Sequence, residues 1–496
     1  MTPPDPAAYG AGVTRAASEC DVLVIGAGPA GCTAAHLLAS WGHAVTIVHR
    51  SPTARVTLAE SLPPSIRKLL RFLGLLDHVD AAGLYPNTGN IIRWAGGARS
   101  TTTRDAGYHV RRAQFDAVLL DAARASSARL VAAVAQHVDQ GDPVEVICKS
   151  GRKTFAVRAR YVLDCSGRAG VVARHGLRRS SAAYRTLAIA ADWDCPAWPA
   201  ADATATTVES YEDGWAWSVP LDARRRQCTV MIDPKDSRPL FRVYDRELAK
   251  ATLVSDRLTG ARRVSSPWTC DASVYDAVRA ADGRCLLVGD AASFIEPLSS
   301  AGVKKSLLSA WRAAVVVNTC LTNSSMAAAA LDLFVRREHE VHEECRRRSA
   351  AFFADAAAFH HTGFWSARTG ESAGADADTR VDVRAVHGAT AAAFERLRAA
   401  RVIRLRPNIA LQFVSVAAID GRDVVMREAV LGPASAVPLP FAEGVDLAVL
   451  ARVAAAAGDV ESTIAAYQDR VGPVELPELL KGLSLLVARS VLTLES

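Results

Sequence analysis

Three glycines near the start of the chain have the spacing of a phosphate-binding turn. Gly26, Gly28 and Gly31 stand in GAGPAG, directly after the apolar run CDVLVI and before the Ala- and Leu-rich segment CTAAHLLASWG. Such glycines allow a tight turn and a close backbone approach to a pyrophosphate. Pro29 and Ala30 would open the helix, whose N-terminus offers free N–H groups and partial positive charge. With the strand HAVTIVHR, the segment predicts a dinucleotide-binding βαβ unit.

The end of this second strand departs from the usual pattern. Units of this kind normally place Asp or Glu there, because a carboxylate bonds the ribose hydroxyls. Here the strand ends in His49 and Arg50. A neutral imidazole can accept one hydrogen bond, and Arg50 can reach a phosphate or stack on adenine. We therefore expect a dinucleotide site that holds its ligand less tightly than a carboxylate would.

Composition narrows the classes of function. The chain has 496 residues with 58 Lys and Arg against 52 Asp and Glu, a mild net charge of +6 that predicts no nucleic-acid partner. The ten Cys show no Cys-x-x-Cys pair and no metal-ligand spacing, so we expect reduced thiols, no metal and a cytoplasmic protein. No apolar run is long enough for a transmembrane segment. Residues 1–19 are rich in Pro, Ala and Gly and are expected to be a disordered tail.

The order of segments predicts an α/β protein of several parts. Residues 20–174 and 281–335 are expected to form the nucleotide-binding domain. Residues 175–280 hold short β-type runs and many Trp, which predicts an inserted antiparallel sheet. Its aromatic side chains could line a substrate pocket, which is the favoured interpretation, or fill the core of the sheet. Residues 336–496 are Ala- and Arg-rich and are expected to be mainly helical, serving as a lid, an interface or a docking surface for a partner. A loop is predicted around residue 375.

Further motifs follow the glycine turn. Arg112 precedes Asp116 by four residues, and YVLDCSGR predicts a strand with a turn. The segment RCLLVGDAASFIEPLSSAGVKK repeats the strand, turn and helix pattern and contains Gly289 and Asp290. An ionised carboxylate such as Asp290 is suited to accept a hydroxyl hydrogen bond, although it could also cap the helix.

Together these motifs resemble the flavoprotein monooxygenases of the glutathione-reductase-like fold. ESLPPS, WAWSVP and the Ser-Ser-x-Gly turn look like the flavin-dependent tryptophan halogenase branch. The resemblance implies non-covalent FAD with its pyrophosphate on the glycine turn, Arg112 beside it and Asp290 on the ribityl chain. It also implies a turn that presents backbone N–H groups to the flavin edge, with candidate residues Pro297, Gly302 and Val303.

One departure bears on the reaction. Halogenases of this branch use a Lys to carry or polarise hypohalous acid, and alignment on Trp94 places Pro86 at that position. The resemblance then implies an FAD-dependent monooxygenase that hydroxylates an aromatic or indole group through a C4a-hydroperoxyflavin. The segment from ESLPPS to GNIIRW also looks like flavoproteins that oxidise peptidyl Trp in quinone-cofactor formation, so the substrate is a small molecule or a polypeptide. Halogenation and a non-oxygenating reduction of the prenyl-reductase type are the alternatives.

No catalytic residue stands out. Lys304 and Lys305 could stabilise a flavin anion, but an exposed helix start is the favoured interpretation. Glu60 could be a base, although a cap for the helix after Pro63 and Pro64 is favoured. Trp217 could keep the substrate away from the flavin or be structural. Because no second glycine motif follows a strand, electrons are expected from transiently bound NAD(P)H or from a partner flavin reductase.

Overall fold

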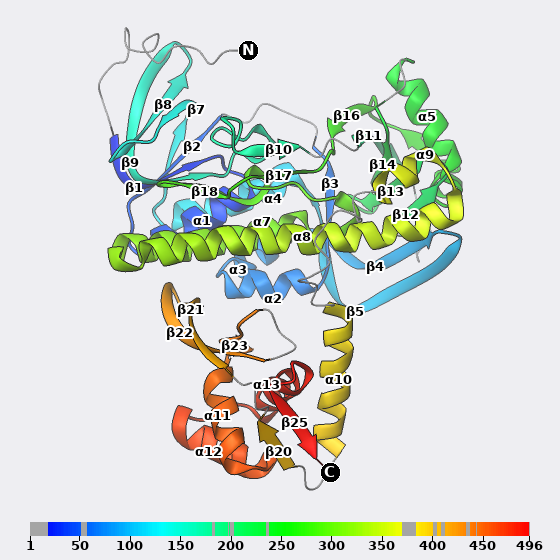
Figure 1. Ribbon diagram of the computed structural model, residues 1–496. Helices are drawn as coiled ribbons and strands as arrows, with labels where there is room; N and C mark the ends of the chain where they lie inside the picture. The colour runs from blue at the N-terminus through cyan, green and yellow to red at the C-terminus, as the bar shows by residue number, and fades with distance from the viewer. Residues whose placement is uncertain are drawn as a thin grey trace. The chain divides into compact units, whose positions relative to one another are not determined.

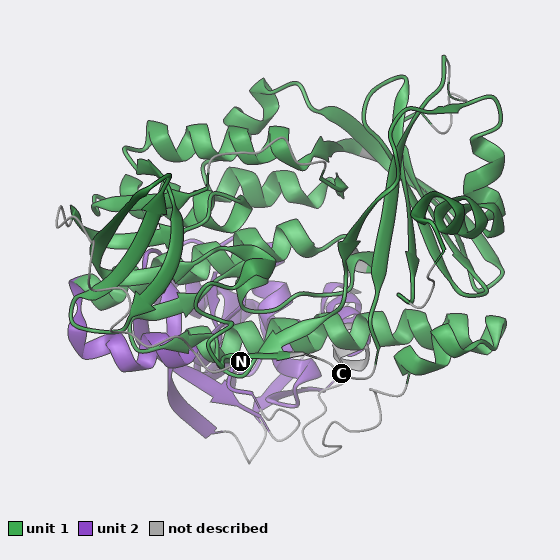
Figure 2. Cartoon of the chain, turned by 90° about the horizontal axis from the view of Figure 1, so that it is seen from above, with its two compact units in different colours: residues 1–321, 334–373 green, residues 322–333, 374–496 purple. Residues whose placement is uncertain are grey.

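The computed structural model describes most of the chain in two compact units. The described residues are 18–50, 57–180, 184–196, 198, 203–234, 238–369, 383–399, 404–407, 412–432, 437–442 and 444–495. Unit 1 comprises residues 1–321 and 334–373, and unit 2 comprises residues 322–333 and 374–496 (Figure 2). Most of the expected disordered tail and of the loop predicted around residue 375 lies outside the described residues.

The nucleotide-binding part of unit 1 is built on a parallel sheet. Its parallel strands are β1 (Ser18–Ile25), β2 (Val45–His49), β6 (Arg129–Ala132), β9 (Lys153–Asp164) and β19 (Cys285–Leu287). They lie in the order β19-β9-β1-β2-β6, so the direction of winding reverses between β1 and β9. In such sheets a ligand binds beyond the carboxyl ends of the strands at this reversal. β18 (Ala281–Asp282) and the hairpin β7 (Val134–Asp139) and β8 (Val144–Ser150) extend the sheet.

The burial of β1 on both faces explains why its sequence is an unbroken run of apolar residues. Val22, Leu23, Val24 and Ile25 are at most 3% exposed, because both faces of the parallel sheet are covered. The helices of this part are α1 (Pro29–Ser40), α4 (Arg112–Ala125) and α7 (Gly302–Thr322). The β1-α1-β2 unit is therefore the one that the glycine spacing predicts.

The second sheet of unit 1 is larger than the predicted insertion of residues 175–280. It has nine strands and includes β3 (Ala59–Leu62), β4 (Tyr85–Trp94) and β5 (Gly97–Arg111), which come from earlier in the chain. The remaining strands are β11 (Leu187–Asp194), β12 (Ala205–Tyr211), β13 (Gly214–Pro220), β14 (Arg225–Ile232), β15 (Arg262–Arg263) and β16 (Trp268–Asp271). β4 pairs with β12 in parallel, which joins the early hairpin to the insertion.

Successive side chains of β13 point to opposite faces of this sheet and belong to two separate hydrophobic clusters. Trp215, Trp217 and Val219 point to one face, where they pack with residues of α8 (Ala327–His360) and α9 (Gly363–Thr369). Ala216 points to the other face, which packs against α5 (Leu240–Lys250) and α6 (Thr252–Arg257). The first of these clusters is called the aromatic layer below.

Helix α8 connects the two parts of unit 1 (Figure 1). Glu338 accepts hydrogen bonds from Arg312 of α7 at 2.7 and 3.0 Å. Further along α8, the Phe352 carbonyl accepts a hydrogen bond from Trp94 of β4 at 3.0 Å. The predicted domain boundary at residue 335 falls inside this helix. The remaining elements of unit 1 are α2 (Ser65–Phe72), α3 (Leu76–Ala81), β10 (Arg178–Ser180) and β17 (Tyr275–Ala277).

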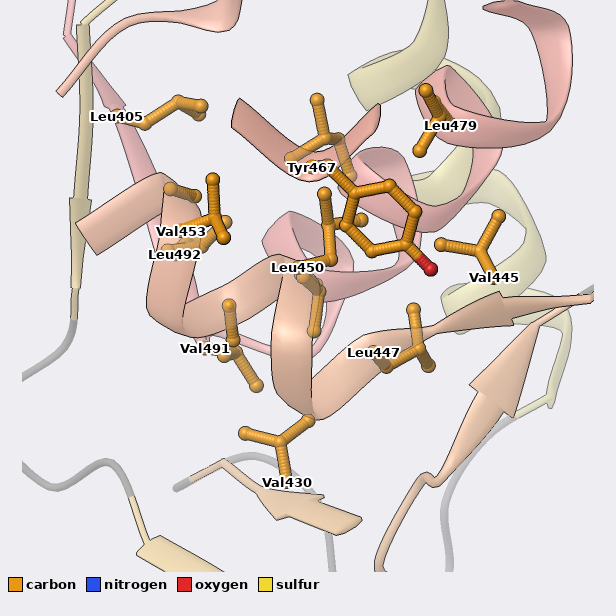
Figure 3. Packing of buried hydrophobic residues seen from close by; sticks show 14 of the residues in the cluster. Leu405, Val430, Val445, Leu447, Leu450, Val453, Tyr467, Leu479, Val491 and Leu492 are labelled. Carbon is orange, nitrogen blue, oxygen red and sulfur yellow. The ribbon is translucent and has the colours of Figure 1, made fainter. Parts of the chain in front are cut away.

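Unit 2 has its own hydrophobic core (Figure 3). Leu447, Leu450, Tyr467, Leu479 and Leu483 are fully buried there. This region was expected to be mainly helical, but strands accompany the helices. Its elements include α10 (Val383–Ala399), β20 (Arg404–Pro407), β21 (Gln412–Asp420), β22 (Asp423–Leu431), β23 (Phe441–Ala442), β24 (Val445–Asp446), α11 (Leu447–Ala457), α12 (Val460–Val471), α13 (Leu476–Ala488) and β25 (Leu492–Glu495).

The apolar stretch near the C-terminus belongs to this core. Leu479, Leu483 and Leu486 of α13 are fully buried, so that face of the helix packs inside unit 2. Within the described residues, no helix is both long and apolar enough to cross a membrane.

Candidate active site

The glycine turn is closed on one side and open on the other. Gly26 has φ +107°, and an added Cβ would lie 2.5 Å from the Cys165 carbonyl oxygen. A Cβ on Gly31 would lie 2.0 Å from the Gly26 oxygen. At Gly28 the nearest atom would be an Arg112 guanidinium nitrogen at 3.9 Å. The turn therefore packs tightly through Gly26 and Gly31, while Gly28 leaves room for a ligand.

The start of α1 is suited to an anion. Gly28 is its N-cap and Pro29 its first residue, no side chain caps it, and its first turn has no acidic residue. The backbone N–H groups that begin the helix therefore have no side-chain acceptor there. This arrangement fits the pyrophosphate of FAD.

His49 contacts the glycine turn itself. Its Nδ1 accepts a hydrogen bond from the Ala27 backbone N–H at 3.3 Å. Burial, followed by the charge of Arg50, lowers the pKa of His49, so the ring is neutral at pH 7. With Nδ1 as acceptor, Nε2 carries the proton and is a donor. From the sequence, His49 was expected to accept a hydrogen bond from the cofactor. In the structure its acceptor nitrogen, Nδ1, is already bonded to the Ala27 N–H, so the other ring nitrogen could only donate a hydrogen bond to a ligand. Arg50, just after β2, is exposed.

Arg112 connects two carboxylates. It lies 3.1 Å from Asp116 and 3.5 Å from Glu60. The pKa of Glu60 is raised, mainly by burial of its carboxyl group. The positive charge of Arg112 partly opposes this shift, and the negative charge of Asp290 adds to it. Burial also raises the pKa of Asp116. The expectation that Glu60 caps α2 is wrong, because the N-cap of that helix is Pro64 and no side chain bonds its first turn.

Asp290 lies in a short 3-10 turn, η3 (Gly289–Ala291), at the end of β19. Its side chain is 28% exposed and lies 3.6 Å from the Lys305 ammonium. The Tyr275 hydroxyl donates to its backbone carbonyl at 2.6 Å. The turn is therefore held by its neighbours while the carboxylate keeps an open side, as a ribityl-binding acid requires.

The two lysines at the start of α7 have different environments. Lys305 is 3% exposed and donates to the Gly289 carbonyl at 3.1 Å and to the Ser293 carbonyl. The favoured interpretation of an exposed helix start is wrong for Lys305, whose amine fixes the turn that carries Asp290. Lys304 is half-buried, and among the described residues the structure records no partner for its side chain.

The segment between Asp290 and α7 forms a second helix N-terminus at the site. Pro297 begins the turn η4 (Pro297–Ser299), and Ser300 has φ +48°. Gly302 opens α7, where an added Cβ would meet no atom within 4 Å, and Val303 is buried. These residues fit the predicted approach to the flavin edge.

Sequence reasoning missed the role of Asp164 at the end of β9. Its carboxylate is fully buried and accepts hydrogen bonds from the Ser166 N–H at 3.1 Å and the Val172 N–H at 2.7 Å. It therefore shapes the turn whose Cys165 packs on Gly26. The signal was available, because an Asp followed by Cys-Ser-Gly at a strand end is typical of a side chain that organises a turn.

Trp217 lies in the aromatic layer, not at the glycine turn. It is 5% exposed, and its indole Nε1 has no hydrogen-bond partner among the described residues. Trp365, Phe353 and Trp94 also belong to this layer, with Trp94 and Trp365 ring centroids 5.4 Å apart. A layer of flat apolar groups with an available donor suits an aromatic ligand.

Pro86, the residue at the expected lysine position, lies on β4. It is exposed, and its Cα pairs with Tyr108 of β5. The next residue, Asn87, is 4% exposed and donates to Ser61 at 2.9 Å. Neither residue supplies an amine at this point of the sheet.

The ten cysteines are all free thiols, and burial raises the pKa of most of them. Among the described residues, no cluster of His, Cys, Asp and Glu could hold a metal ion.

Known proteins share this architecture. The tryptophan 2-halogenase of Chondromyces crocatus is 28% identical over 371 residues, which cover 71% of each chain. The flavin-dependent halogenase CmlS has a TM-score of 0.77 at 22% identity, covering 97% of this chain and 96% of its own. The peptidyl tryptophan dihydroxylase QhpG has a TM-score of 0.69 at 22% identity, covering 95% of this chain and 99% of its own. At 22% identity, the similarities to CmlS and QhpG show a shared fold.

A family model described as an FAD binding domain matches residues 19–344, more than half of the chain. With the glycine turn, Asp290 and the two helix N-termini in place, this match identifies the protein as a member of the FAD-binding-domain family and as an FAD-dependent oxidoreductase related to the flavin-dependent halogenases and monooxygenases.

Proposed function

We propose that this protein is an FAD-dependent monooxygenase that hydroxylates an aromatic or indole ring. One observation carries the choice of hydroxylation: no strand of the nine-stranded sheet contains a lysine within its described bounds. The halogenase branch that the sequence resembles uses a lysine amine to handle hypohalous acid. Pro86 and Asn87 occupy the matching part of β4, and neither has an amine.

The residues around the glycine turn have distinct proposed roles. Gly28, Pro29, Ala30 and the start of α1 would hold the pyrophosphate, and Asp290 would accept a ribityl hydroxyl. Arg112 would lie beside the cofactor, with its charge balanced by Glu60 and Asp116. Bound FAD, once reduced, would supply the activation of O₂.

The N-terminus of α7 would act on the electronics of the cofactor. Its first backbone N–H groups, from Gly302 onward, carry the positive end of the helix dipole. That field favours negative charge on the flavin carbonyl edge, as in other sites where a helix start faces developing charge.

The aromatic layer is the proposed substrate side. Trp215 and Trp217 would contact a flat ring and exclude water from it. The similarity to the tryptophan 2-halogenase and the fold likeness to QhpG support an indole, free or within a polypeptide. Electrons would come from a partner flavin reductase or from transiently bound NAD(P)H, because no second glycine motif follows a strand.

Halogenation is the second candidate, and the named relatives favour it. Lys304 is the described lysine that would then have to act, since its amine has no recorded partner and stands in the first turn of α7.

The two reactions are separated by isotope labelling. Protein supplied with reduced FAD, ¹⁸O₂ and bromide is given L-tryptophan, indole and a Trp-containing peptide, and the products are weighed by mass spectrometry. We expect one ¹⁸O per hydroxylation and no bromine. A bromine isotope doublet would support halogenation instead. Reduction of an added acceptor without O₂ uptake would support the prenyl-reductase class.

A further inference from the structure

A buried serine and a buried glutamate lie behind the turn that carries Asp290. Ser309 of α7 is fully buried, and Glu338 of α8 is 3% exposed. None of the roles assigned above to the cofactor site uses either residue. Charged side chains are seldom buried this deeply unless they are paired. The hydrogen bonds of these two residues lead from α8 to the backbone of η3.

The Ser309 hydroxyl connects α8 with η3. Its Oγ accepts a hydrogen bond from the Gly289 backbone N–H at 2.8 Å and donates to Glu338 Oε2 at 2.9 Å. The direction of both bonds is fixed, because a backbone N–H only donates and a carboxylate oxygen only accepts. The single hydroxyl proton therefore points to Glu338, and a lone pair of the same oxygen points to Gly289.

Arg312 leaves one oxygen of Glu338 to the serine. Its Nε and Nη2 both donate to Oε1, at 3.0 and 2.7 Å. Oε2 is thus the oxygen that accepts from Ser309. A buried ion pair often adds little stability beyond that of apolar side chains of the same size, so stability alone does not explain this pair. Its geometric effect is to hold the carboxylate in one orientation toward Ser309.

Gly289 places the turn against the start of α1. Its φ is +65°, and an added Cβ would lie 3.0 Å from the Ala30 Cβ and 3.1 Å from Ser306 Oγ. Its carbonyl accepts a hydrogen bond from the Lys305 amine at 3.1 Å, and its N–H donates to the serine hydroxyl described above. Side chains of α7 therefore hold both backbone groups of the residue that precedes Asp290.

Loss of the serine hydroxyl would release one side of this residue. The buried N–H of Gly289 would then lack its acceptor, at a cost comparable to that of a lost hydrogen bond. Glycine populates a wide range of backbone angles, so the turn could rotate to relieve that cost. Such a rotation would also move the next residue, Asp290, whose side chain is 28% exposed on its open side.

We infer that Ser309 and Glu338 are positioning residues for Asp290. Glu338 orients the Ser309 hydroxyl, and the hydroxyl holds the Gly289 N–H, which fixes the Asp290 carboxylate toward the ribityl chain of FAD. Both residues act through the backbone of η3 and not by contact with the cofactor. The inference rests on the proposed role of Asp290 in FAD binding, and it does not depend on whether the enzyme hydroxylates or halogenates.

The affinities of full-length, flavin-free protein for FAD and for ADP test this inference. ADP contains the pyrophosphate and adenosine of FAD but no ribityl chain, so a contact with Asp290 contributes to FAD affinity alone. Ser309→Ala should weaken FAD binding about fivefold, as for one lost hydrogen bond, and leave ADP affinity within about twofold of wild type. Unchanged FAD affinity, or an equal loss for both ligands, would overturn the inference.

A double-mutant cycle with Asp290→Ala tests whether the serine acts through the aspartate. Asp290→Ala by itself should weaken FAD binding. Ser309→Ala should then add less than about a twofold further loss in that background, because the effects of coupled residues are not additive. Fully additive losses would show that Ser309 does not act through Asp290 and would overturn the inference.

Glu338→Gln keeps the volume of the side chain and changes the bond to the serine. The two donors of Arg312 favour the amide oxygen, so the amide NH₂ group faces Ser309, where it only donates. The serine hydroxyl then loses the acceptor that orients it. We expect the same selective loss of FAD affinity, with no further loss when Ser309→Ala is added. Wild-type FAD affinity of Glu338→Gln would overturn the role of Glu338.

Thr319→Val is the matched control for the loss of a buried hydroxyl. Thr319 is also buried in α7, and its hydroxyl donates to the Val315 carbonyl of the same helix at 2.9 Å. The control should leave FAD and ADP affinities within about twofold of wild type, while the melting temperature of every variant reports its folding. A loss of FAD affinity as large as that of Ser309→Ala would overturn the inference.

These measurements separate the inference from the proposed function. If Asp290→Ala binds FAD as wild type does, the proposed role of Asp290 is wrong, and the inference is wrong with it. If Asp290→Ala weakens FAD binding but Ser309→Ala does not, only the inference is wrong. The isotope-labelling experiment bears on neither outcome, because it reports the reaction and not the affinity for the cofactor.

Discussion

The Nδ1 of His49 accepts the backbone N–H of Ala27, 3.3 Å away across the glycine turn. The residue that ends β2 thus stabilises the turn that would hold the pyrophosphate. Its Nε2 side, which carries the proton, is the side that can face a ribose. A carboxylate at this position could serve both the Ala27 N–H and a ribose hydroxyl as an acceptor.

His49→Glu should therefore tighten FAD binding, by about 1–2 kcal/mol, which is the range for charge-assisted hydrogen bonds. The measurement is the FAD dissociation constant of reconstituted protein by fluorescence quenching. His49→Gln is the matched control, because it offers an acceptor without charge. An unchanged or weaker affinity of the Glu variant would show that the imidazole donor matters more than a second acceptor.

Gly28→Val should give folded but colourless protein. A Cβ at Gly28 has only Arg112 as a neighbour, at 3.9 Å, so the loss would come from blocking the pyrophosphate. Gly31→Val is the contrasting variant, since its Cβ would lie 2.0 Å from the Gly26 oxygen and should disturb the fold itself. Circular dichroism and flavin absorbance separate the two effects. Wild-type flavin occupancy in Gly28→Val would show that the phosphates lie elsewhere.

Arg112→Met should make stability depend more strongly on pH. The pKa values of Glu60 and Asp116 are already raised by burial, and Arg112 is the cation that lowers both. Without it their folded-state pKa values rise further above the unfolded values. For a carboxyl with a raised pKa, stability is present at low pH and is lost as pH rises through the folded-state pKa.

The measurement is the melting temperature of Arg112→Met between pH 5 and pH 8. The variant should lose a few degrees relative to wild type at pH 8 and recover much of that loss at pH 5. Arg112→Lys keeps the charge and should behave more like wild type. A constant difference at all pH values would indicate that packing, not charge, is what Arg112 contributes.

Lys305→Met should destabilise unit 1 and weaken FAD retention. The variant would leave the Gly289 and Ser293 carbonyls without their buried donor, at a cost of about 1–3 kcal/mol. Lys304→Met, one residue earlier and half-buried, should leave the melting temperature within a degree or so of wild type. Equal effects of the two variants in thermal unfolding would contradict the separate roles assigned to these lysines.

Leu483→Ala should destabilise unit 2 and leave flavin binding in place. Leu483 is fully buried in the core of that unit, and such truncations cost about 2–5 kcal/mol. Limited proteolysis should cut the C-terminal region of the variant faster, with an unchanged FAD-to-protein ratio. Loss of flavin in parallel would show that the fold of unit 2 supports the cofactor site.

The sequence by itself determined the parts whose partners lie close along the chain. The spacing of Gly26, Gly28 and Gly31 between two apolar runs predicts the β1-α1-β2 unit, because each contact spans only a few residues. The double proline before Ser65 likewise predicts the start of α2, and Asp290 follows β19 as its motif requires. The family of the protein could be predicted from these local patterns alone.

Only the tertiary structure decided the contacts between residues far apart in the sequence. β4 joins β12 across more than a hundred residues, Glu338 of α8 accepts hydrogen bonds from Arg312 of α7, and Trp94 of β4 donates to the Phe352 carbonyl of α8. The sequence alone suggests that Lys305 is a surface residue. In the structure, the packing of η3 against α7 buries its side chain. Burial and charge pairing depend on which faces of distant elements meet, and no pattern within one segment carries that information. For the same physical reason, the sequence does not reveal that the Glu296 side chain is buried.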